Sequence, residues 1–176
     1  PAAEDGTLSV DSLPVLKAFL DRATVLVAGG GLGQSDDVRA VLTELLKTFE
    51  GPALLDADAL NNLAGDLPVL KERTAPTVLT PHPGEMARLT GKPVSELLTD
   101  RVSAAKTFAD EYGVTVLLKG PDTVIASCDS EEIFVNATGN EGLAKGGSGD
   151  TLSGILGALL AQGAAPLPAG GGGRAR

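Results

Sequence analysis

An apolar run passes directly into a glycine turn at Val25-Leu26-Val27-Ala28-Gly29-Gly30-Gly31-Leu32-Gly33. Beyond this turn, apolar side chains recur at helical spacing between positions 38 and 49. An apolar run without alternation is typical of a strand that is covered on both faces of a parallel sheet. The segment therefore predicts a strand, a tight turn and a helix, in that order.

The same alternation of strand and helix continues along the chain. Buried strands are predicted at Ala53–Leu55, Thr77–Thr80 and Val114–Leu118. Thr99 or Asp100 is expected to cap the helix that precedes the third of these strands. These elements extend the α/β pattern over most of the chain.

The pattern changes near the C-terminal end. Thr123–Ala126 and Ile133–Asn136 flank a polar stretch, which predicts an antiparallel hairpin at a sheet edge. An amphipathic helix is predicted to begin just after Asp150. The apolar face of that helix comprises Leu152, Ile155, Leu156, Leu159 and Leu160. We therefore expect an α/β fold with a mostly parallel central sheet flanked by helices.

The chain of 176 residues has enough apolar material for one core, and we expect one domain over residues 1–163. Both ends look incomplete as folding units, so we expect this domain to be truncated. Residues 164–176 include Gly170–Gly173 and form a low-complexity tail that cannot bury a core.

The net charge of −9, from 14 basic and 23 acidic residues, argues against a nucleic-acid partner. A phosphate group can still be captured by local basic groups and helix N-termini. Because Cys128 is the single cysteine, no intramolecular disulfide forms, and we expect a cytoplasmic protein. No apolar run approaches the length of a membrane span, so no membrane association is expected.

A glycine-rich stretch, Gly146-Gly147-Ser148-Gly149-Asp150, leads into the last predicted helix. Small residues let the backbone approach a ligand, and the N–H groups at a helix N-terminus attract phosphate. Asp150 is therefore a candidate base for a substrate hydroxyl that is held at this loop. The alternative is that Asp150 is only the N-cap of the helix.

The loop from Asn136 to Gly142 adds side-chain donors and the carboxylate of Glu141, which is compatible with a metal ion. Ordering so long a glycine-rich loop is costly without a ligand. Lys145 either contacts the phosphates or is a solvated surface lysine. The candidate nucleotide-binding residues of this loop are Asn136, Thr138, Gly139 and Asn140.

Two prolines frame His82 in Thr80-Pro81-His82-Pro83-Gly84-Glu85-Met86. Each proline favours extended geometry in the residue before it, so His82 is presented at the C-terminal end of a predicted strand, where open α/β sheets bind ligands. His82 is the only histidine and either contacts a ligand or is a satisfied structural residue. Glu85 is either a site residue or an acid in the first turn of a helix.

Three further groups follow predicted strands. Gly29–Gly33 fits neither the dinucleotide fingerprint nor the Walker loop, so it serves either ligand approach or a tight reversal. Asp56 and Asp58 either line a pocket or bond to loop amides. The nucleotide is expected to contact the segment Lys119–Thr123, because Lys119 ends a buried strand and needs an anion unless its ammonium reaches solvent.

Together these motifs resemble the NAD(P)H-hydrate dehydratases, repair enzymes with a ribokinase-like fold. Thr80–Leu89 and Asn136–Asp150 are similar to the two signatures of that family, and Leu55–Asn61 and Val116–Gly120 extend the similarity in the same order. The resemblance covers the chain from Leu8 to Gly163.

The resemblance implies dehydration of hydrated NADH or NADPH at the expense of ADP or ATP, with Mg²⁺ accompanying the nucleotide. Asp150 would deprotonate the hydrate's hydroxyl, phosphoryl transfer would make that oxygen a leaving group, and elimination would regenerate the coenzyme. The family also implies a homo-oligomer.

The resemblance assigns the two ligands to different residues. Gly31, Gly33, His82 and Asp150 would bind the hydrate. No residue is assigned as a ligand of the metal. The nucleotide would be bound by Lys119, Gly120, Pro121, Asp122, Thr123, Asn136, Thr138, Gly139, Asn140, Gly146, Gly147, Ser148 and Gly149.

The chain departs from the family in three places. Gly30 stands where the family usually has proline, the start of the family's sheet is missing, and the sequence after Gly163 lacks the expected helix. Two alternative functions are a hydroxymethyl kinase of the same fold and a truncated, catalytically silent nucleotide-binding module. The Pro-His-Pro-Gly-Glu element favours the dehydratase over the kinase.

Overall fold

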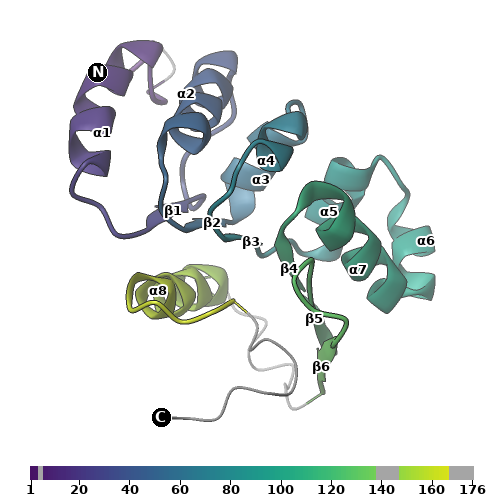
Figure 1. Cartoon of the computed structure of the whole chain (residues 1–176). Coiled ribbons are helices and arrows are strands. Elements are labelled where there is room, and N and C mark those ends of the chain that lie inside the picture. Colours follow the sequence, from purple (N-terminus) through teal and green to yellow (C-terminus); the bar gives the residue numbers. More distant parts are fainter. Residues whose placement is uncertain (4–5, 138–146, 167–176) are drawn as a thin grey trace, which may run out of the picture.

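The computed structural model describes residues 1–3, 6–137 and 147–166 (Figure 1). Within these residues the sheet has the strand order β1-β2-β3-β4-β5-β6. The strands β1 (Leu26–Ala28), β2 (Ala53–Leu55), β3 (Thr77–Leu79) and β4 (Thr115–Leu118) run parallel. The strands β5 (Thr123–Ser127) and β6 (Phe134–Asn136) continue the sheet in antiparallel pairing. The predicted parallel sheet and edge hairpin are confirmed.

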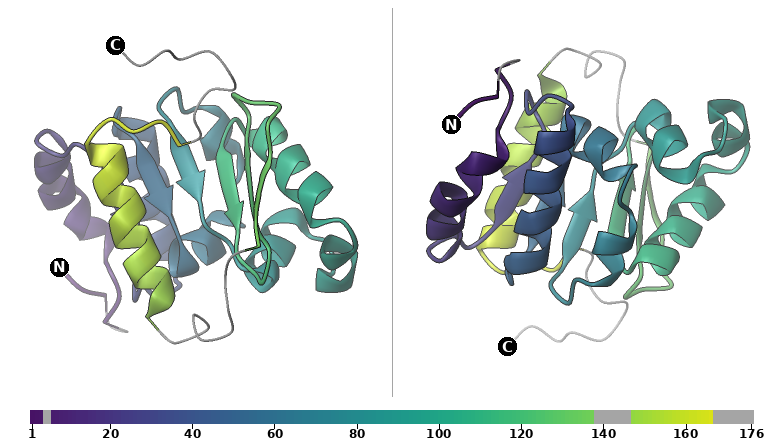
Figure 2. Two further views of the ribbon diagram at one scale, coloured as in Figure 1. Left: turned by 90° about the horizontal axis from the view of Figure 1, so that it is seen from below. Right: turned by 90° about the horizontal axis from the view of Figure 1, so that it is seen from above.

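Helices cover both faces of this sheet. Helix α8 (Ser148–Ala161) contacts β1 and β2 on one face, and the other described helices lie on the opposite face (Figures 1 and 2). Those helices are η1 (Val10–Ser12, a 3-10 turn), α1 (Leu13–Leu20), α2 (Asp36–Thr48), α3 (Ala57–Leu63), α4 (Pro68–Lys71), α5 (Pro83–Thr90), α6 (Val94–Thr99) and α7 (Arg101–Tyr112). No helix within the described ranges combines the length and the apolarity needed to cross a bilayer.

Alternate residues of β2 and β3 enter two separate apolar clusters. Leu55 and Leu79 pack into the larger cluster, under the helices α2 to α7. Their neighbours Leu54 and Val78 point to the other face and meet Leu160 of α8. Because successive side chains of a strand point to opposite faces, an unbroken apolar run satisfies both layers at once.

The helices begin where the sequence provides caps. The Ser35 hydroxyl accepts a hydrogen bond from Val38 N at 3.1 Å and starts α2. The Asp100 carboxylate accepts one from Ser103 N at 2.9 Å and starts α7, so Asp100 is the predicted cap, rather than Thr99. These local bonds satisfy amide groups that have no partner inside a helix.

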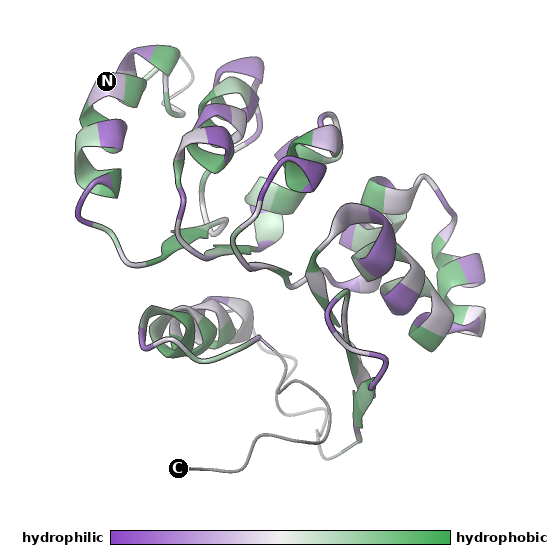
Figure 3. Cartoon of the chain, viewed as in Figure 1, coloured by the Kyte–Doolittle hydropathy of each residue, from purple (hydrophilic) through white to green (hydrophobic). Residues whose placement is uncertain are grey.

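The prediction for the last helix is wrong in two respects. The helix begins at Ser148, so Asp150 lies inside its first turn, and its buried residues are Ser153, Gly157 and Leu160. Ile155 and Leu159, which were expected in the core, are 56% and 46% exposed. Figure 3 shows hydrophobic stretches along α8, but the side of the helix that packs on the sheet carries Ser153 and Gly157 as well as Leu160, rather than the face with most of the large apolar side chains.

Close packing selects the face of α8 that is buried. A Cβ atom placed on Gly157 would lie 2.6 Å from Cγ2 of Val27 on β1. A larger residue at this position would push the helix away from the sheet. At this point of α8 a glycine, rather than a large apolar residue, forms the contact with β1.

We predict that Arg73→Met destabilises the fold by about 3 kcal/mol, because several acceptors would lose a charged donor. The Arg73 guanidinium donates to the carbonyls of Leu46, Phe49 and Gly51 and to the Thr77 hydroxyl, which ties the end of α2 to the start of β3. Urea unfolding measures the change.

The matched control for this substitution is Arg22→Met, at an exposed arginine just after α1. We expect it to change the free energy of unfolding by less than about 0.5 kcal/mol. An equal loss of stability in the two variants would contradict the role of Arg73.

Candidate functional site

The carboxyl ends of the parallel strands and the N-terminus of α8 meet at one edge of the sheet. Asp56 follows β2 and Lys119 follows β4, and their side chains are joined across β3 at 2.7 Å between Oδ1 and Nζ. Ser153 of α8 donates a hydrogen bond to the other Asp56 oxygen at 3.1 Å. Asp56 and Lys119, which the sequence analysis considered for the site, are therefore brought together with Ser153 of α8 at this edge.

Asp56, Lys119 and Ser153, which we call the Asp56 cluster, form the base of the site. Asp56 is 5% exposed and Ser153 is 7% exposed. Burial by itself raises the pKa of the Asp56 carboxyl, but the bond and the charge of Lys119, with smaller help from the Thr80 hydroxyl and Ala57 N–H, hold that pKa below its usual range. Asp56 is therefore ionised and balanced by Lys119 at neutral pH.

The contact with Asp56 decides between the two alternatives for Lys119, which were an anionic partner and an ammonium that reaches solvent. Its side chain is 24% exposed and does not reach freely into solvent. The anion that meets its ammonium is Asp56, with Glu85 Oε2 further away at 3.9 Å. A nucleotide phosphate is not needed to compensate the charge of Lys119.

His82 acts as the N-cap of α5. Its Nδ1 accepts hydrogen bonds from Gly84 N at 2.9 Å and Glu85 N at 3.2 Å, so the ring proton lies on Nε2, 3.3 Å from Glu85 Oε1. Glu85 in turn accepts a bond from His82 N at 2.8 Å, which completes a capping box. Glu85 is therefore an acid in the first turn of α5, as the structural alternative for this residue proposed.

The structural interpretation of His82 explains its ring orientation. The Nδ1 edge is used by the cap, while half of the side chain remains exposed. Contact with the hydrate through that exposed part stays a prediction.

The glycine turn is held in place by Asp58. Its Oδ2 accepts a hydrogen bond from Gly33 N at 3.0 Å, and Asn62 Nδ2 donates to Gly33 O at 2.8 Å. Asp58 therefore orients a loop, as one of its two alternatives proposed. Gly29 is required for a different reason, because a Cβ atom there would lie 2.1 Å from the carbonyl oxygen of Asp56.

A cavity of about 450 Å³ opens beside this turn. Its lining is mostly backbone and small residues, which suits a ligand that is held by shape and by amide groups. The lining residues are Pro1, Ala2, Gly6, Thr7, Leu8 and Gly30 to Gly33. Gly31 and Gly33, the predicted substrate contacts, both border this cavity.

A second cavity of about 450 Å³ lies among the helices α5, α6 and α7. Its lining includes Leu89, Leu97, Phe108 and Tyr112, and none of the residues predicted for the site. Of the two cavities, only the one beside the glycine turn is bordered by predicted site residues, Gly31 and Gly33.

Asp150 is the third residue of α8, whose N-cap is Gly147 with φ 87°. The alternative that Asp150 is the N-cap is therefore wrong. Its Oδ1 lies 2.5 Å from the position that a Cβ atom on Gly30 would take, so the carboxylate faces the glycine turn. No hydrogen bond or ion pair joins this carboxylate to another residue in the described part of the chain.

The position of the Asp150 carboxylate determines what chemistry the site can perform. The carboxylate lies in the first turn of α8, on the side that faces the glycine turn. A base without a competing partner can accept a proton from a hydroxyl that is bound in the cavity. Gly30 lies opposite this carboxylate.

The segment after Lys119 forms the turn between β4 and β5 and includes Gly120, Pro121, Asp122 and Thr123. Thr123 is paired with Asn136 of β6, so these two predicted nucleotide contacts lie side by side. Arg101 Nη2 donates to the carbonyls of Leu118 and Lys119, each at 3.0 Å, and a Cβ atom on Gly120 would lie 2.4 Å from it.

Gly147, Ser148 and Gly149 lie at the start of α8, as expected for phosphate contact. Thr138, Gly139, Asn140 and Gly146 lie outside the described residues, as do Glu141, Gly142 and Lys145.

Ser153 and Arg101 were not identified from the sequence. Ser153 has a usable signal, because a serine three residues after Asp150 in an otherwise apolar helix lies on the same side as Asp150. Arg101 has no such signal, since its partners are backbone carbonyls 17 and 18 positions away.

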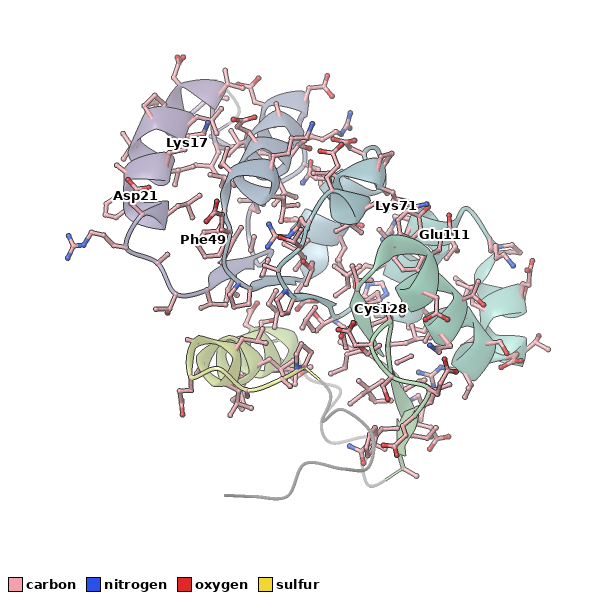
Figure 4. All side chains as sticks on the ribbon, viewed as in Figure 1. Lys17, Asp21, Phe49, Lys71, Glu111 and Cys128 are labelled. Carbon is pink, nitrogen blue, oxygen red and sulfur yellow. The ribbon has the colours of Figure 1, made fainter. Side chains whose placement is uncertain are left out.

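Cys128 takes no part in this edge of the sheet. It follows β5, which runs antiparallel to β4, so it lies at the opposite end of the sheet, beside Val114 (Figure 4). Burial raises the pKa of its thiol, followed by the effect of Asp129. A thiol with a raised pKa is a poor nucleophile.

Comparison with known proteins agrees with this geometry. A family model described as NAD(P)H-hydrate dehydratase matches residues 6–171. The ADP-dependent (S)-NAD(P)H-hydrate dehydratase of Neisseria meningitidis serogroup B is 46% identical over 140 residues, which are 78% of this chain and 47% of that protein. The chain spans 29% to 47% of the length of the curated relatives it matches.

Two solved structures share the fold. The ADP/ATP-dependent NAD(P)H-hydrate dehydratase from Bacillus subtilis, co-crystallised with ATP/Mg²⁺, has a TM-score of 0.68 and 35% identity, covering 87% of this chain and 60% of its own. A ribokinase-like superfamily protein from Enterococcus faecalis has a TM-score of 0.73 and 28% identity, covering 88% and 53%. The fold is therefore ribokinase-like, and a family model that matches nearly the whole sequence shows that the chain belongs to the NAD(P)H-hydrate dehydratase family.

Proposed function

We propose that this chain carries the site for nucleotide-dependent dehydration of hydrated NADH or NADPH. The observation that carries the proposal is the placement of Asp150, whose carboxylate has no described partner and faces the glycine turn beside an open cavity. The names of the Neisseria and Bacillus relatives support the choice of reaction.

In the proposed reaction Asp150 takes the proton of the hydrate's hydroxyl as that oxygen attacks the terminal phosphoryl group of ADP or ATP. The phosphorus–oxygen bond to the rest of the nucleotide breaks, which leaves AMP or ADP. The phosphorylated hydrate then loses phosphate by elimination, and the nicotinamide coenzyme is regenerated. The N–H groups at the start of α8 stabilise the charge on the transferred group.

The two ligands approach Asp150 from different segments. The hydrate is placed in the cavity of the glycine turn, against Gly31 and Gly33 and near the exposed part of His82. The nucleotide is placed between the Lys119–Thr123 turn and the start of α8. Arg101 supports the first of these two segments through its bonds to Leu118 O and Lys119 O.

Mg²⁺ fits this arrangement. The ion takes most of its ligands from phosphate oxygens and water and needs only one or two carboxylates from a protein. The described residues contain no group of three or more His, Cys, Asp or Glu side chains that could hold a metal ion, so Mg²⁺ would be held mainly by phosphate oxygens of the nucleotide and by water. When bound, Mg²⁺ would neutralise charge on the transferring phosphoryl group.

The net charge and the exposed apolar side chains bear on the partners of the protein. The net charge of −9 opposes binding of nucleic acid, and we place the protein in the cytoplasm as a homo-oligomer. Exposed apolar side chains such as Phe19 (69%) and Ile155 (56%) support association with further protein surface.

Nucleotide binding is expected to raise the melting temperature. A ligand that binds only the folded chain stabilises it by about 2.7 kcal/mol at a concentration 100 times its Kd. Thermal unfolding with ADP, ATP and AMP, each with and without Mg²⁺, measures the shift. An unchanged melting temperature with all three nucleotides would contradict the proposed nucleotide binding.

We predict that Asp150→Asn retains nucleotide binding and lowers kcat by about 10²- to 10⁴-fold, because the amide cannot accept the hydroxyl proton. Regeneration of NADH from its hydrate, followed by absorbance, measures turnover. The control is Asp21→Asn, at an exposed residue after α1 that should behave as wild type.

Two outcomes of this assay count against the proposal. An Asp150→Asn variant with normal turnover would eliminate Asp150 as the base. A wild-type chain that phosphorylates thiazole or pyridine alcohols and leaves the hydrate unchanged would instead show the hydroxymethyl kinase.

His82→Asn separates the capping role of His82 from substrate contact. An asparagine side chain can still accept from the amides of the first turn, whereas alanine cannot and should cost about 1 kcal/mol of stability. We expect KM for the hydrate to rise in both His82→Asn and His82→Ala, while only the alanine variant unfolds at lower urea. An unchanged KM in the asparagine variant would mean that His82 is a cap and nothing more.

A further inference from the structure

The Asp56 carboxylate bonds to residues of two other elements at once. Oδ1 lies 2.7 Å from Lys119 Nζ, at the end of β4, and Oδ2 accepts a bond from Ser153 Oγ of α8 at 3.1 Å. The backbone of Asp56 adds a third link, because its N–H donates to Ala28 O at the end of β1 at 3.0 Å. One buried residue therefore connects three strand ends with the helix that carries Asp150.

The helix meets this carboxylate at its first two turns. Ser153 lies three positions after Asp150, so the two side chains stand on neighbouring parts of the same helical face. A Cβ atom on Gly149 would lie 3.3 Å from Asp56 Oδ2 and 3.8 Å from Lys119 Nζ. The first turn of α8 thus rests on the Asp56 cluster at close range.

The contact of α8 with the sheet is otherwise formed mainly by small or apolar groups. Gly157 allows close approach to Val27, and Leu160 packs with Leu54 and Val78. Such contacts select the buried face of the helix but give little directional restraint to its first turn, at the carboxyl edge of the sheet. A directional bond from Ser153 to a buried, ionised carboxylate supplies that restraint.

The backbone beside Asp56 is strained. Ala57 has φ 46°, and it is the only non-glycine residue with positive φ in the described part of the chain. Such a conformation is unfavourable for an alanine, because its Cβ crowds the following carbonyl oxygen. This strained residue directly follows Asp56, whose side-chain direction determines its bonds to Lys119 and Ser153.

We propose that Asp56 and Ser153 are positioning residues: the Asp56 carboxylate anchors Ser153 and thereby fixes Asp150 against the glycine turn in the geometry that proton transfer requires. Lys119 neutralises the carboxylate and aims it. The proposal rests on the proposed function for its catalytic consequence, but the anchoring of α8 is a property of the folded chain alone.

Ser153→Ala tests this most directly, because it removes one hydroxyl, leaves the Asp56–Lys119 pair intact and touches neither ligand. We expect kcat to fall about tenfold or more while KM for the nucleotide and the hydrate stays within about twofold, since small misplacements of a catalytic group are costly. The matched control is Ser95→Ala, at an exposed serine of α6, which should match wild type.

Hydrogen–deuterium exchange supplies a readout that does not depend on activity. In Ser153→Ala we expect faster exchange over α8 (Ser148–Ala161) and unchanged exchange over α5. Asp56→Asn is the second variant, because its amide keeps the shape of the side chain but removes the charge that Lys119 balances. It should show a loss of kcat at least as large as that of Ser153→Ala.

The outcomes are distinct. Unchanged exchange over α8 in Ser153→Ala overturns the proposal, and so does faster exchange with an undiminished kcat per folded molecule. A lower melting temperature with proportionate loss of active protein, but normal kcat, would show a purely structural serine. If the wild-type chain has no turnover, the proposed function fails, and the exchange measurement alone decides whether Asp56 anchors α8.

Discussion

Between the ends of β2 and β4, the Asp56 carboxylate meets the Lys119 ammonium at 2.7 Å, and both groups are largely withdrawn from water. Taking either charge out of water alone would be costly, and removal of one partner would leave the other uncompensated. The pair therefore constrains two strand ends that are separated by β3. Ser153 extends the constraint to α8, so both layers that border the site share one polar anchor.

This anchor complements the apolar packing of the two faces. Leu55 and Leu79 enter the core under the helices α2 to α7, and Leu54 and Val78 form the contact with α8. Apolar burial supplies most of the favourable energy of such an arrangement but has little directional preference. A few directional bonds at the carboxyl edge of the sheet therefore determine where Asp150 points.

Structural roles belong to two residues whose motifs suggested ligand binding. His82 caps α5 through Nδ1, and Asp58 holds Gly33 through its N–H. A residue that keeps a loop or a helix start in one conformation also keeps the neighbouring cavity in one shape. Structural and binding roles are thus compatible at these positions, and the geometry alone favours the structural one.

Much of the fold follows from local patterns. Short unalternating apolar runs indicated the parallel strands, polar stretches indicated the edge hairpin, and Asp100 was among the expected caps. The motifs around His82 and before Asp150 also indicated the family that the comparisons show. These features depend on residues within a few positions of one another, which is why a sequence read without coordinates reveals them.

Other features depended on contacts between distant segments. The rotation of α8 was predicted wrongly, because most of its large apolar residues lie on one side of the helix, whereas the close fit of Gly157 to Val27 places another side on the sheet. The partners of Asp56 lie 63 and 97 positions away, at Lys119 and Ser153. The sequence by itself determined the elements, the family and the candidate base. Only the tertiary structure decided how that base is held, since side-chain geometry across layers arises when the layers pack.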